Sequence, residues 1–365
     1  MPGALVVGQA GLMRVTPADF YRGSMRLIYL LEGTESWGGV KAVLEHANGL
    51  TRRGHRVQVL SKGQAPTWFP LEADFRQVPD FAAEQIPIAD YIIGTYWTTV
   101  PPAVACGRGI PVHFCQGYEA DYFPDVALCE RVEAAYRLPT LKVTIRPHLK
   151  ALIETRYGQA CYDIGYGIDL NRFNPEPPPP LQGRYRILVV GPWEWPFKGI
   201  PDALQGLKQL KTQRRDLWVV RASQLPQSEA EAALDVVDEY HQDVNPYAMP
   251  ALYRRCHLFI SASTEAEGFG LPAMEAMACG LPCVLTRIPS YLSFDDGEAY
   301  ASFVPLRDPL AISAAVDGLL NDLLQRAWQR TAGLKVAARY PMEAVVERLE
   351  ALLLRGLSDR MIRRS

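Results

Sequence analysis

The sequence predicts an α/β protein with two domains, each built around a parallel β-sheet. Its 365 residues exceed the size at which a single hydrophobic core usually stops growing. Short β-rich runs alternate with helical stretches in both halves, and repeated strand–helix–strand units form parallel sheets with right-handed crossovers. A proline-rich segment at Asn171–Gly183, "NRFNPEPPPPLQG", interrupts this alternation and is expected to be stiff and extended.

The first half of the chain contains five short β-rich runs. The predicted strands are Arg26–Leu31, Arg56–Leu60, Tyr91–Gly94, Val112–Cys115 and Lys142–Ile145. Between the first two, the apolar residues Val40, Val43, Leu44, Ala47 and Leu50 recur at the spacing of one helix face. This pattern predicts an amphipathic helix, and Gly54 suits the position just past its end.

The second half repeats the alternation. The predicted strands are Arg184–Val190, Leu217–Ala222, His257–Ala262 and Cys283–Thr286. The last two are nearly continuous apolar runs, as expected for strands buried on both faces. A long helix closes the chain, with one apolar stripe formed by Met342, Val345, Val346, Leu349, Leu352 and Leu353.

These patterns predict five segments. They are an N-terminal extension (1–24), an N-terminal Rossmann-like domain (25–170), a linker (171–183), a C-terminal Rossmann-like domain (184–340), and a C-terminal helix with its tail (341–365). Two α/β domains joined by a stiff linker enclose a cleft, where small ligands usually bind.

Charge and composition exclude some classes of partner. A net charge of −2 means that the chain has no overall positive charge to attract nucleic acid. Cationic residues gather from Lys335 to the end of the chain, which favours a solvated helix face over a membrane-surface patch. Seven scattered cysteines without a CxxC pair indicate a reducing compartment.

Targeting signals are weak. No apolar run approaches the roughly 18–20 residues of a membrane span, and the opening "MPGALVVGQAGLM" lacks a basic start typical of a signal peptide. We therefore expect a cytoplasmic protein and leave open peripheral contact with the inner face of the membrane.

The stretch "EAEGFGLPAMEAMACG" (Glu265–Gly280) has the strongest functional pattern. Its glycines permit unusual backbone angles, and Pro272 and Gly280 suit the start and end of a helix of about two turns. A glycine turn that leads into a helix N-terminus presents unpaired N–H groups to an anion. Together with carboxylates Glu267 and Glu275, which can accept hydrogen bonds from hydroxyls, this arrangement predicts a nucleotide-sugar site.

Two acids eight residues apart are weak support by themselves, because an ordinary α/β domain can also carry a loop acid and an exposed helical acid. The full string, however, resembles the E-x7-E signature of glycosyltransferase family 4, whose members have the GT-B fold. The similar segments are Glu267–Glu275 itself, "WGGVKAVLEHANGLTRRGHRVQVLS" (Trp37–Ser61), "GYGIDLNRFNP" (Gly165–Pro175) and "LRDPLAISAAVDGLLND" (Leu306–Asp322). A further segment, "HFCQGYEADYFP" (His113–Pro124), is similar to a subgroup that includes bacterial rhamnosyltransferases of surface-polysaccharide synthesis.

The resemblance implies a role for each matching residue. Glu275 would bind the ribose and Glu267 the donor sugar, while Lys198 in "GPWEWPFKG" would neutralise the diphosphate leaving group. The remaining donor contacts would come from the backbone of Phe269, Gly270, Leu271, Gly38 and Gly39. Candidate contacts to the acceptor or sugar are His113, Gln116 and Glu119. The family also implies a C-terminal helix that crosses back to the N-terminal domain.

Three departures from the family pattern concern the donor and acceptor sites. Pro192 and Trp193 follow Gly191, where the family usually has an arginine, and Arg221 and Arg287 are candidate replacements. Gln116 stands where a histidine is common. Ile288–Ser290 replaces an expected glycine pair.

The function expected from the resemblance is that of a retaining, metal-independent transferase. It would move a hexosyl or deoxyhexosyl group from a nucleotide-diphosphate sugar to a glycan, lipid or small molecule, with UDP, GDP and dTDP donors all open. No cofactor is expected beyond the donor, which is a substrate. The alternative is a catalytically degenerate GT-B protein that binds a sugar nucleotide or glycan without turnover.

Overall fold

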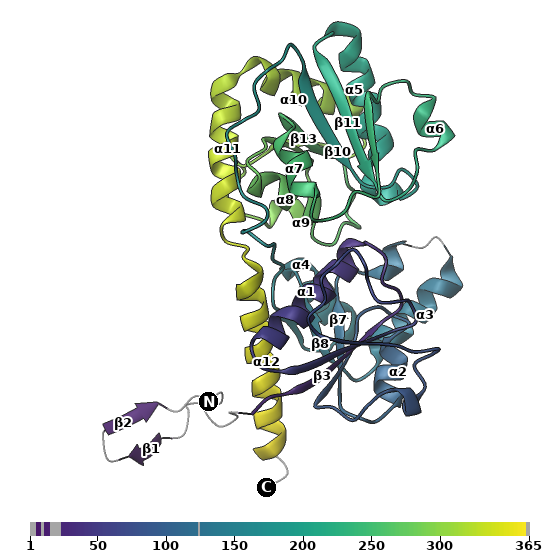
Figure 1. The fold of residues 1–365 in the computed structure, drawn as a ribbon, viewed down its shortest axis with the longest axis vertical. Coiled ribbons are helices and arrows are strands. Elements are labelled where there is room, and N and C mark those ends of the chain that lie inside the picture. Colours follow the sequence, from purple (N-terminus) through teal and green to yellow (C-terminus); the bar gives the residue numbers. More distant parts are fainter. Residues whose placement is uncertain (1–4, 9–10, 15–22, 123–124, 363–365) are drawn as a thin grey trace.

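A computed structural model describes residues 5–8, 11–14, 23–122 and 125–362. Much of the predicted extension and the last three residues of the predicted tail lie outside this part. The described chain forms two α/β lobes stacked along the long axis of the molecule (Figure 1). A separate antiparallel pair, β1 (Leu5–Gly8) and β2 (Gly11–Arg14), lies beside the N-terminal lobe.

The N-terminal lobe contains a seven-stranded sheet with the order β5-β4-β3-β6-β7-β8-β9, in which every pair is parallel. Its strands are β3 (Arg26–Leu31), β4 (Arg56–Ser61), β5 (Asp74–Gln77), β6 (Tyr91–Gly94), β7 (Ile110–Cys115), β8 (Leu141–Thr144) and β9 (Cys161–Asp163). Its helices are α1 (Gly38–Arg52), α2 (Val100–Ala105), α3 (Val126–Arg137) and α4 (Pro147–Tyr157).

The C-terminal lobe contains a six-stranded parallel sheet with the order β12-β11-β10-β13-β14-β15. Its strands are β10 (Tyr185–Val190), β11 (Leu217–Ser223), β12 (Glu239–Gln242), β13 (Leu258–Ser261), β14 (Cys283–Thr286) and β15 (Ser302–Val304). Its helices are α5 (Ile200–Gln213), α6 (Glu229–Ala232), α7 (Met249–Arg254), α8 (Leu271–Ala278), α9 (Pro289–Leu292), α10 (Pro309–Asn321) and α11 (Leu323–Ala337).

All nine predicted strands are present with nearly the predicted ends. The pair β1 and β2 was not predicted, nor were four further strands of the two large sheets. These four, β5, β9, β12 and β15, are the edge strands of the two sheets. An edge strand pairs on one side only, so its sequence need not be a continuous apolar run. The polar sequences of β5 (DFRQ) and β12 (EYHQ) illustrate this, since both strands are mostly solvent-accessible.

The C-terminal helix α12 (Met342–Ile362) crosses back and lies along the N-terminal lobe (Figure 1). All six residues of its predicted apolar stripe are buried. Gly49 of α1 permits this close packing, because a Cβ there would lie 2.5 Å from Cγ2 of Val346. The Tyr91 hydroxyl also donates to the carbonyl of Leu353 over 2.6 Å. The returning helix is therefore part of the N-terminal core.

The segment just before the linker and the segment that leads into α12 run side by side at Ile168 and Pro341. The amide of Ile168 donates to the carbonyl of Tyr340 over 2.9 Å, and the amide of Met342 donates back to Ile168 over 3.0 Å. Residues 171–183 that follow form no helix or strand.

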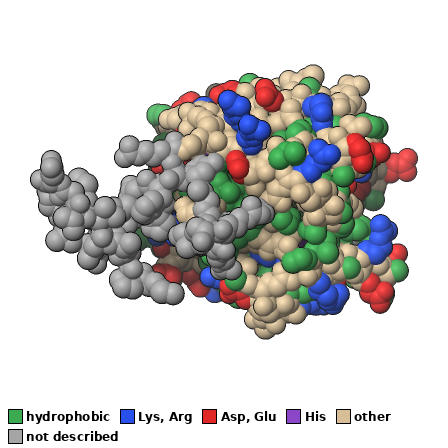
Figure 2. Space-filling view, turned by 90° about the horizontal axis from the view of Figure 1, so that it is seen from below, with side chains coloured by type: hydrophobic (Ala, Val, Ile, Leu, Met, Phe, Trp, Pro, Cys, Tyr) green, Lys and Arg blue, Asp and Glu red, His purple; other side chains and the backbone are tan. Residues whose placement is uncertain are grey.

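The surface carries mixed charge on the face that Figure 2 shows, where basic, acidic and hydrophobic side chains are interspersed. Two of the C-terminal cations are engaged within the protein, since Arg339 pairs with Asp295 and Arg348 donates to the carbonyl of Ile164. Within the described residues, no helix has the length and apolarity needed to cross a membrane.

Candidate active site

A cavity of about 820 Å³ lies between the two lobes. It is lined by segments that directly follow β3, β6, β7 and β8 of one sheet and β10, β11 and β13 of the other. Ligands of open α/β sheets bind outside the carboxyl ends of the strands, and here both sheets direct those ends toward one space. The volume is in the range typical of small-ligand sites.

The predicted glycine turn and helix form one wall of this cavity. Gly270 has a φ of 85° and precedes α8, whose eight residues match the predicted two turns. Gly268 allows the opposite lobe to approach, because a Cβ there would lie 2.3 Å from the carbonyl oxygen of Gln116. The glycines therefore permit both the turn and the close contact between lobes.

Phe269 anchors the turn with its side chain. Its ring stacks on Tyr166 with centroids 4.5 Å apart, and the guanidinium of Arg146 lies 4.8 Å from its centroid. Arg146, at the start of α4 in the N-terminal lobe, also donates to the carbonyl of Ser290 over 2.6 Å. This buried arginine thus attaches the N-terminal lobe to the turn and to the segment that replaces the family's glycine pair.

Glu267 and Lys198 meet at the cavity although they are far apart in sequence. Lys198 Nζ lies 2.8 Å from Glu267 Oε2, and their side chains are 15% and 9% exposed. Ser263 also donates to the same carboxylate oxygen over 3.0 Å. Gly199 allows this arrangement, because its φ of 60° and the nearby carbonyl of Ala262 exclude a side chain.

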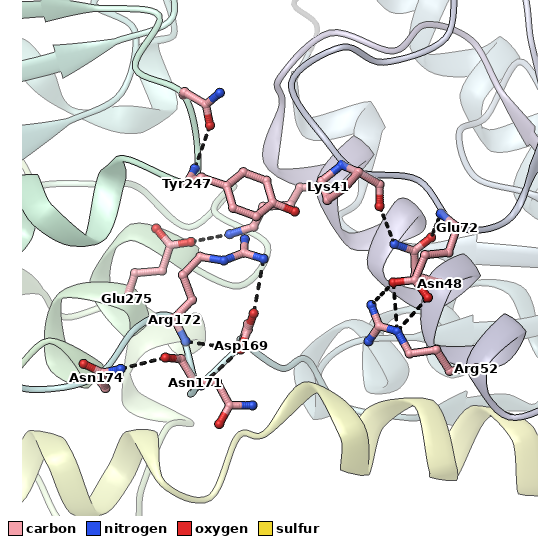
Figure 3. A network of polar contacts seen from close by, with 12 residues as sticks. Lys41, Asn48, Arg52, Glu72, Asp169, Asn171, Arg172, Asn174, Tyr247 and Glu275 are labelled. Atoms are coloured by element: carbon pink, nitrogen blue, oxygen red, sulfur yellow. Dashed lines mark hydrogen bonds and ion pairs between the residues drawn. The ribbon is translucent and has the colours of Figure 1, made fainter.

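Glu275 has partners from both lobes, of which Figure 3 shows Lys41. Its Oε1 lies 2.7 Å from Lys41 Nζ, and its Oε2 accepts a hydrogen bond from the hydroxyl of Tyr253 over 3.1 Å. Sequence reasoning did not identify Lys41. The available signal was a lysine in the first turn of the predicted helix, where the helix dipole disfavours a cation.

Gly38 and Gly39 bring the N-terminus of α1 against the opposite lobe. A Cβ on Gly38 would lie 3.3 Å from the side chain of Leu271, at the start of α8. The N-termini of α1 and α8 therefore both face the cavity, and each contributes unpaired N–H groups and the positive end of a helix dipole. Such a site favours a bound anion.

The three candidate acceptor contacts have different positions. Gln116 and Glu119 line the cavity. Glu119 is only 4% exposed and accepts a hydrogen bond from Tyr136, and burial raises its pKa to about 7. His113, by contrast, lies within β7, is fully buried, and does not line the cavity. Burial holds its pKa well below the usual value, so His113 is a neutral core residue rather than a ligand contact.

Neither candidate for the missing arginine reaches the cavity. Arg221 is fully buried and donates to the carbonyls of Gly191 and Val189 over 2.8 and 2.9 Å. Its Nε lies 2.6 Å from Glu231. Arg287 is exposed and pairs with Glu298 over 2.7 Å. Among the described residues that line the cavity, the cations are Lys41 and Lys198.

Solved structures with this architecture define the class of the fold. Anabaena HepE, crystallised with UDP and glucose, matches with a TM-score of 0.74 and 14% identity, over 90% of this chain and 99% of that chain. Sucrose-phosphate synthase from Thermosynechococcus elongatus matches with a TM-score of 0.72 and 16% identity, over 93% of this chain and 100% of the synthase chain. WaaG, a glycosyltransferase involved in lipopolysaccharide biosynthesis, matches with a TM-score of 0.71 and 14% identity. That match covers 90% of this chain and 99% of WaaG. The chain therefore has the GT-B fold.

Sequence comparison finds a family match within the C-terminal lobe. The family model described as glycosyl transferases group 1 matches residues 184–322. A phosphatidyl-myo-inositol mannosyltransferase of Mycobacterium leprae is 25% identical over 201 residues, which are 53% of this chain and 53% of the relative. O-antigen chain mannosyltransferase B of Escherichia coli is 32% identical over 98 residues, 26% of this chain and 24% of the relative.

The matched region spans about half or less of these two relatives. Neither is named a rhamnosyltransferase, and membership of that subgroup stays a prediction.

Proposed function

We propose that the protein transfers a sugar from a nucleoside-diphosphate sugar to a hydroxyl of a glycan, lipid or small-molecule acceptor. One observation carries this proposal: two lysine–carboxylate pairs and two helix N-termini face a single cleft between two parallel sheets. The family match within the C-terminal lobe supports it. So do the structures of HepE, which were solved in complex with UDP and glucose and with UDP-glucose.

In this proposal, the donor lies along the cavity wall formed by the glycine turn and α8, and the charges of that wall set its orientation. The diphosphate would lie at the N-terminus of α8, with its charge stabilised by the turn Phe269–Leu271 and by Lys198. The ribose hydroxyls would then reach Glu275, and the sugar would reach Glu267. As the anomeric C–O bond breaks, negative charge builds on the diphosphate, and a preorganised lysine stabilises that charge more in the transition state than in the ground state.

The acceptor would enter from the N-terminal lobe, past Gln116 and Glu119. Its hydroxyl oxygen attacks the anomeric carbon from the side of the departing phosphate. The proton of that hydroxyl passes to a phosphate oxygen of the leaving group, so no protein base is required. Because the new bond forms on the face that the old bond leaves, the anomeric configuration is retained.

Stereochemistry tests this mechanism directly. We expect proton NMR of the first product formed to show the same anomeric configuration as the donor, and we expect turnover to be unchanged by a chelator. The new glycosidic bond does not mutarotate, so the anomeric signal of the product reports the stereochemistry of the transfer directly. An inverted product, or activity that requires a divalent ion, would exclude this mechanism.

Nucleotide binding tests the proposed function itself. In a thermal-shift panel of UDP, GDP, dTDP, ADP and CDP, we expect one base to stabilise the protein. A ligand at 100 times its dissociation constant adds about 2.7 kcal/mol to the free energy of unfolding. Glu275→Ala should abolish the shift, whereas Glu265→Ala, which removes an exposed acid of the same loop, should keep it.

An assay of nucleotide release from sugar donors separates the alternative function. Two departures favour a protein that binds without turnover: the absent arginine beside Lys198, and Gln116 where a histidine is common. Such a protein would give the nucleotide shift but release no nucleotide from any sugar donor in the presence of acceptors. The absence of a shift with every nucleotide would reject a nucleotide-sugar site altogether.

A further inference from the structure

The ion pair between Lys41 and Glu275 directly connects the two lobes at the donor wall. Lys41 belongs to α1 of the N-terminal lobe and Glu275 to α8 of the C-terminal lobe. Their charged atoms are 2.7 Å apart, and each side chain is 9% exposed. Figure 3 shows the lysine extending from α1 across the cleft toward the carboxylate.

In the closed arrangement, the buried position of Lys41 is unfavourable without Glu275 as its partner. A cation in the first turn opposes the dipole of its own helix, and burial of an ammonium group costs several kcal/mol without a partner. Burial works against the charged form, yet the carboxylates of Glu275 and Glu45 raise the pKa of Lys41 overall. The ring of Phe173, whose centroid is 4.7 Å from Nζ, also favours the charged form. Lys41 therefore depends on Glu275 across the cleft.

Glu275 depends on Lys41 in the same way. Tyr253 holds one carboxylate oxygen from within the C-terminal lobe, and Lys41 holds the other from the opposite lobe. Each carboxylate oxygen can accept a second hydrogen bond, so two acceptor positions remain for ribose hydroxyls. In an open cleft, Glu275 would keep only Tyr253 and could rotate.

Other contacts at this edge also join the two lobes. Ser36 donates to Asp243 over 3.0 Å, and the rings of Trp37 and Trp195 lie 4.8 Å apart. All three N-terminal residues of this edge, Ser36, Trp37 and Lys41, come from the start of α1 or the loop just before it. Closure therefore brings one segment of the N-terminal lobe onto the donor wall.

We propose that Lys41 is a positioning residue of the donor site, which acts through Glu275 and orients its carboxylate for the ribose only when the two lobes are closed. This inference rests on the proposed function. It also gives a role to a residue outside the E-x7-E signature, to which the resemblance assigned none. Nucleotide affinity and domain closure are then coupled through a single ion pair, so that a bound nucleotide stabilises the closed cleft.

A double-mutant cycle on nucleotide binding tests this inference. The dissociation constant of UDP, or of the nucleotide selected by the thermal-shift panel, is measured by calorimetry for wild type, Lys41→Met, Glu275→Gln and the double variant. We expect each single change to weaken binding by about tenfold or more, within the range usual for coupled sites. The double variant should bind no more weakly than Glu275→Gln, because Lys41 acts only through that carboxylate.

Two further measurements exclude a purely structural effect. Lys41→Arg should recover part of the lost affinity, since it keeps a cation at the same place. In turnover assays, Lys41→Met should raise KM for the donor and change kcat by less than about threefold, because uniform binding is lost. Arg52→Met removes an exposed ion pair with Glu72 from the same helix and should leave nucleotide affinity unchanged.

The outcomes separate this inference from the proposed function. If wild type binds no nucleotide, the proposed function fails first. If wild type binds nucleotide and Lys41→Met binds it equally well, the inference is overturned while the function stands. The same holds if the losses of binding free energy in the two single variants add in the double variant. Tighter binding by Lys41→Met would also overturn it, because the lysine would then compete with the nucleotide for Glu275.

Discussion

Replacement of Lys198 by alanine is expected to lower kcat by about 10²–10³-fold, the usual cost of removing one charge-stabilising group from an active site. Lys198 is one of two cations that line the cavity among the described residues, and the neighbouring arginine of the family pattern is absent. The other cation that lines the described part of the cavity, Lys41, pairs with Glu275 and does not replace the missing arginine beside Lys198. Steady-state assays with a saturating nucleotide-sugar donor measure this change.

Two variants make that result specific. Lys198→Arg keeps the positive charge and should retain more activity than alanine does. Lys208→Ala removes an exposed lysine of α5, ten residues further along the chain, and should leave kcat unchanged. A kcat for Lys198→Ala within about threefold of wild type would mean that the diphosphate charge is neutralised elsewhere, and it would contradict the role assigned to Lys198.

The second large effect concerns stability. Glu231→Ala is expected to lower the free energy of unfolding by about 3–5 kcal/mol, the range measured when one partner of a buried ion pair is removed. The pair of Arg221 and Glu231 has no exposed side-chain surface, so the variant leaves an uncompensated guanidinium inside the protein. Denaturant unfolding followed by tryptophan fluorescence measures the loss.

Two comparisons test the cause. A double variant, Arg221→Met with Glu231→Leu, removes both charges and should recover most of the stability, as apolar replacements of buried pairs often do. Glu298→Ala breaks the exposed pair with Arg287 and should change stability little. If the double variant is as unstable as Glu231→Ala, packing around the site rather than the unpaired charge causes the loss.

Arg221 also shows why one sequence-based expectation was wrong. It was a candidate for the missing diphosphate arginine, and it lies within the predicted strand Leu217–Ala222. The strand instead points its side chain into the core, where it donates to the backbone at Gly191, beside Lys198. Sequence order does not reveal which way a side chain points in a strand buried on both faces. His113 was misassigned for the same reason.

The interior strands of both sheets were predictable because burial on both faces demands apolar residues. The edge strands were not, since a strand such as β12 forms its ladder with one neighbour and keeps a polar sequence. The glycine turn and helix α8 were likewise predictable, because turn residues and helix ends follow local rules. Lys41 was not, because its partner is 234 residues away and in the other lobe.

The paired crossing of the chain at Ile168 and Tyr340 has a mechanical consequence. Two adjacent connections that are hydrogen-bonded to each other restrict relative motion of the lobes more than one flexible connection would. Rotation of one lobe about the line through both connections keeps these hydrogen bonds, whereas twisting or sliding one lobe against the other would break them. We therefore expect opening and closing of the cleft to follow that rotation and to return Lys41 to Glu275.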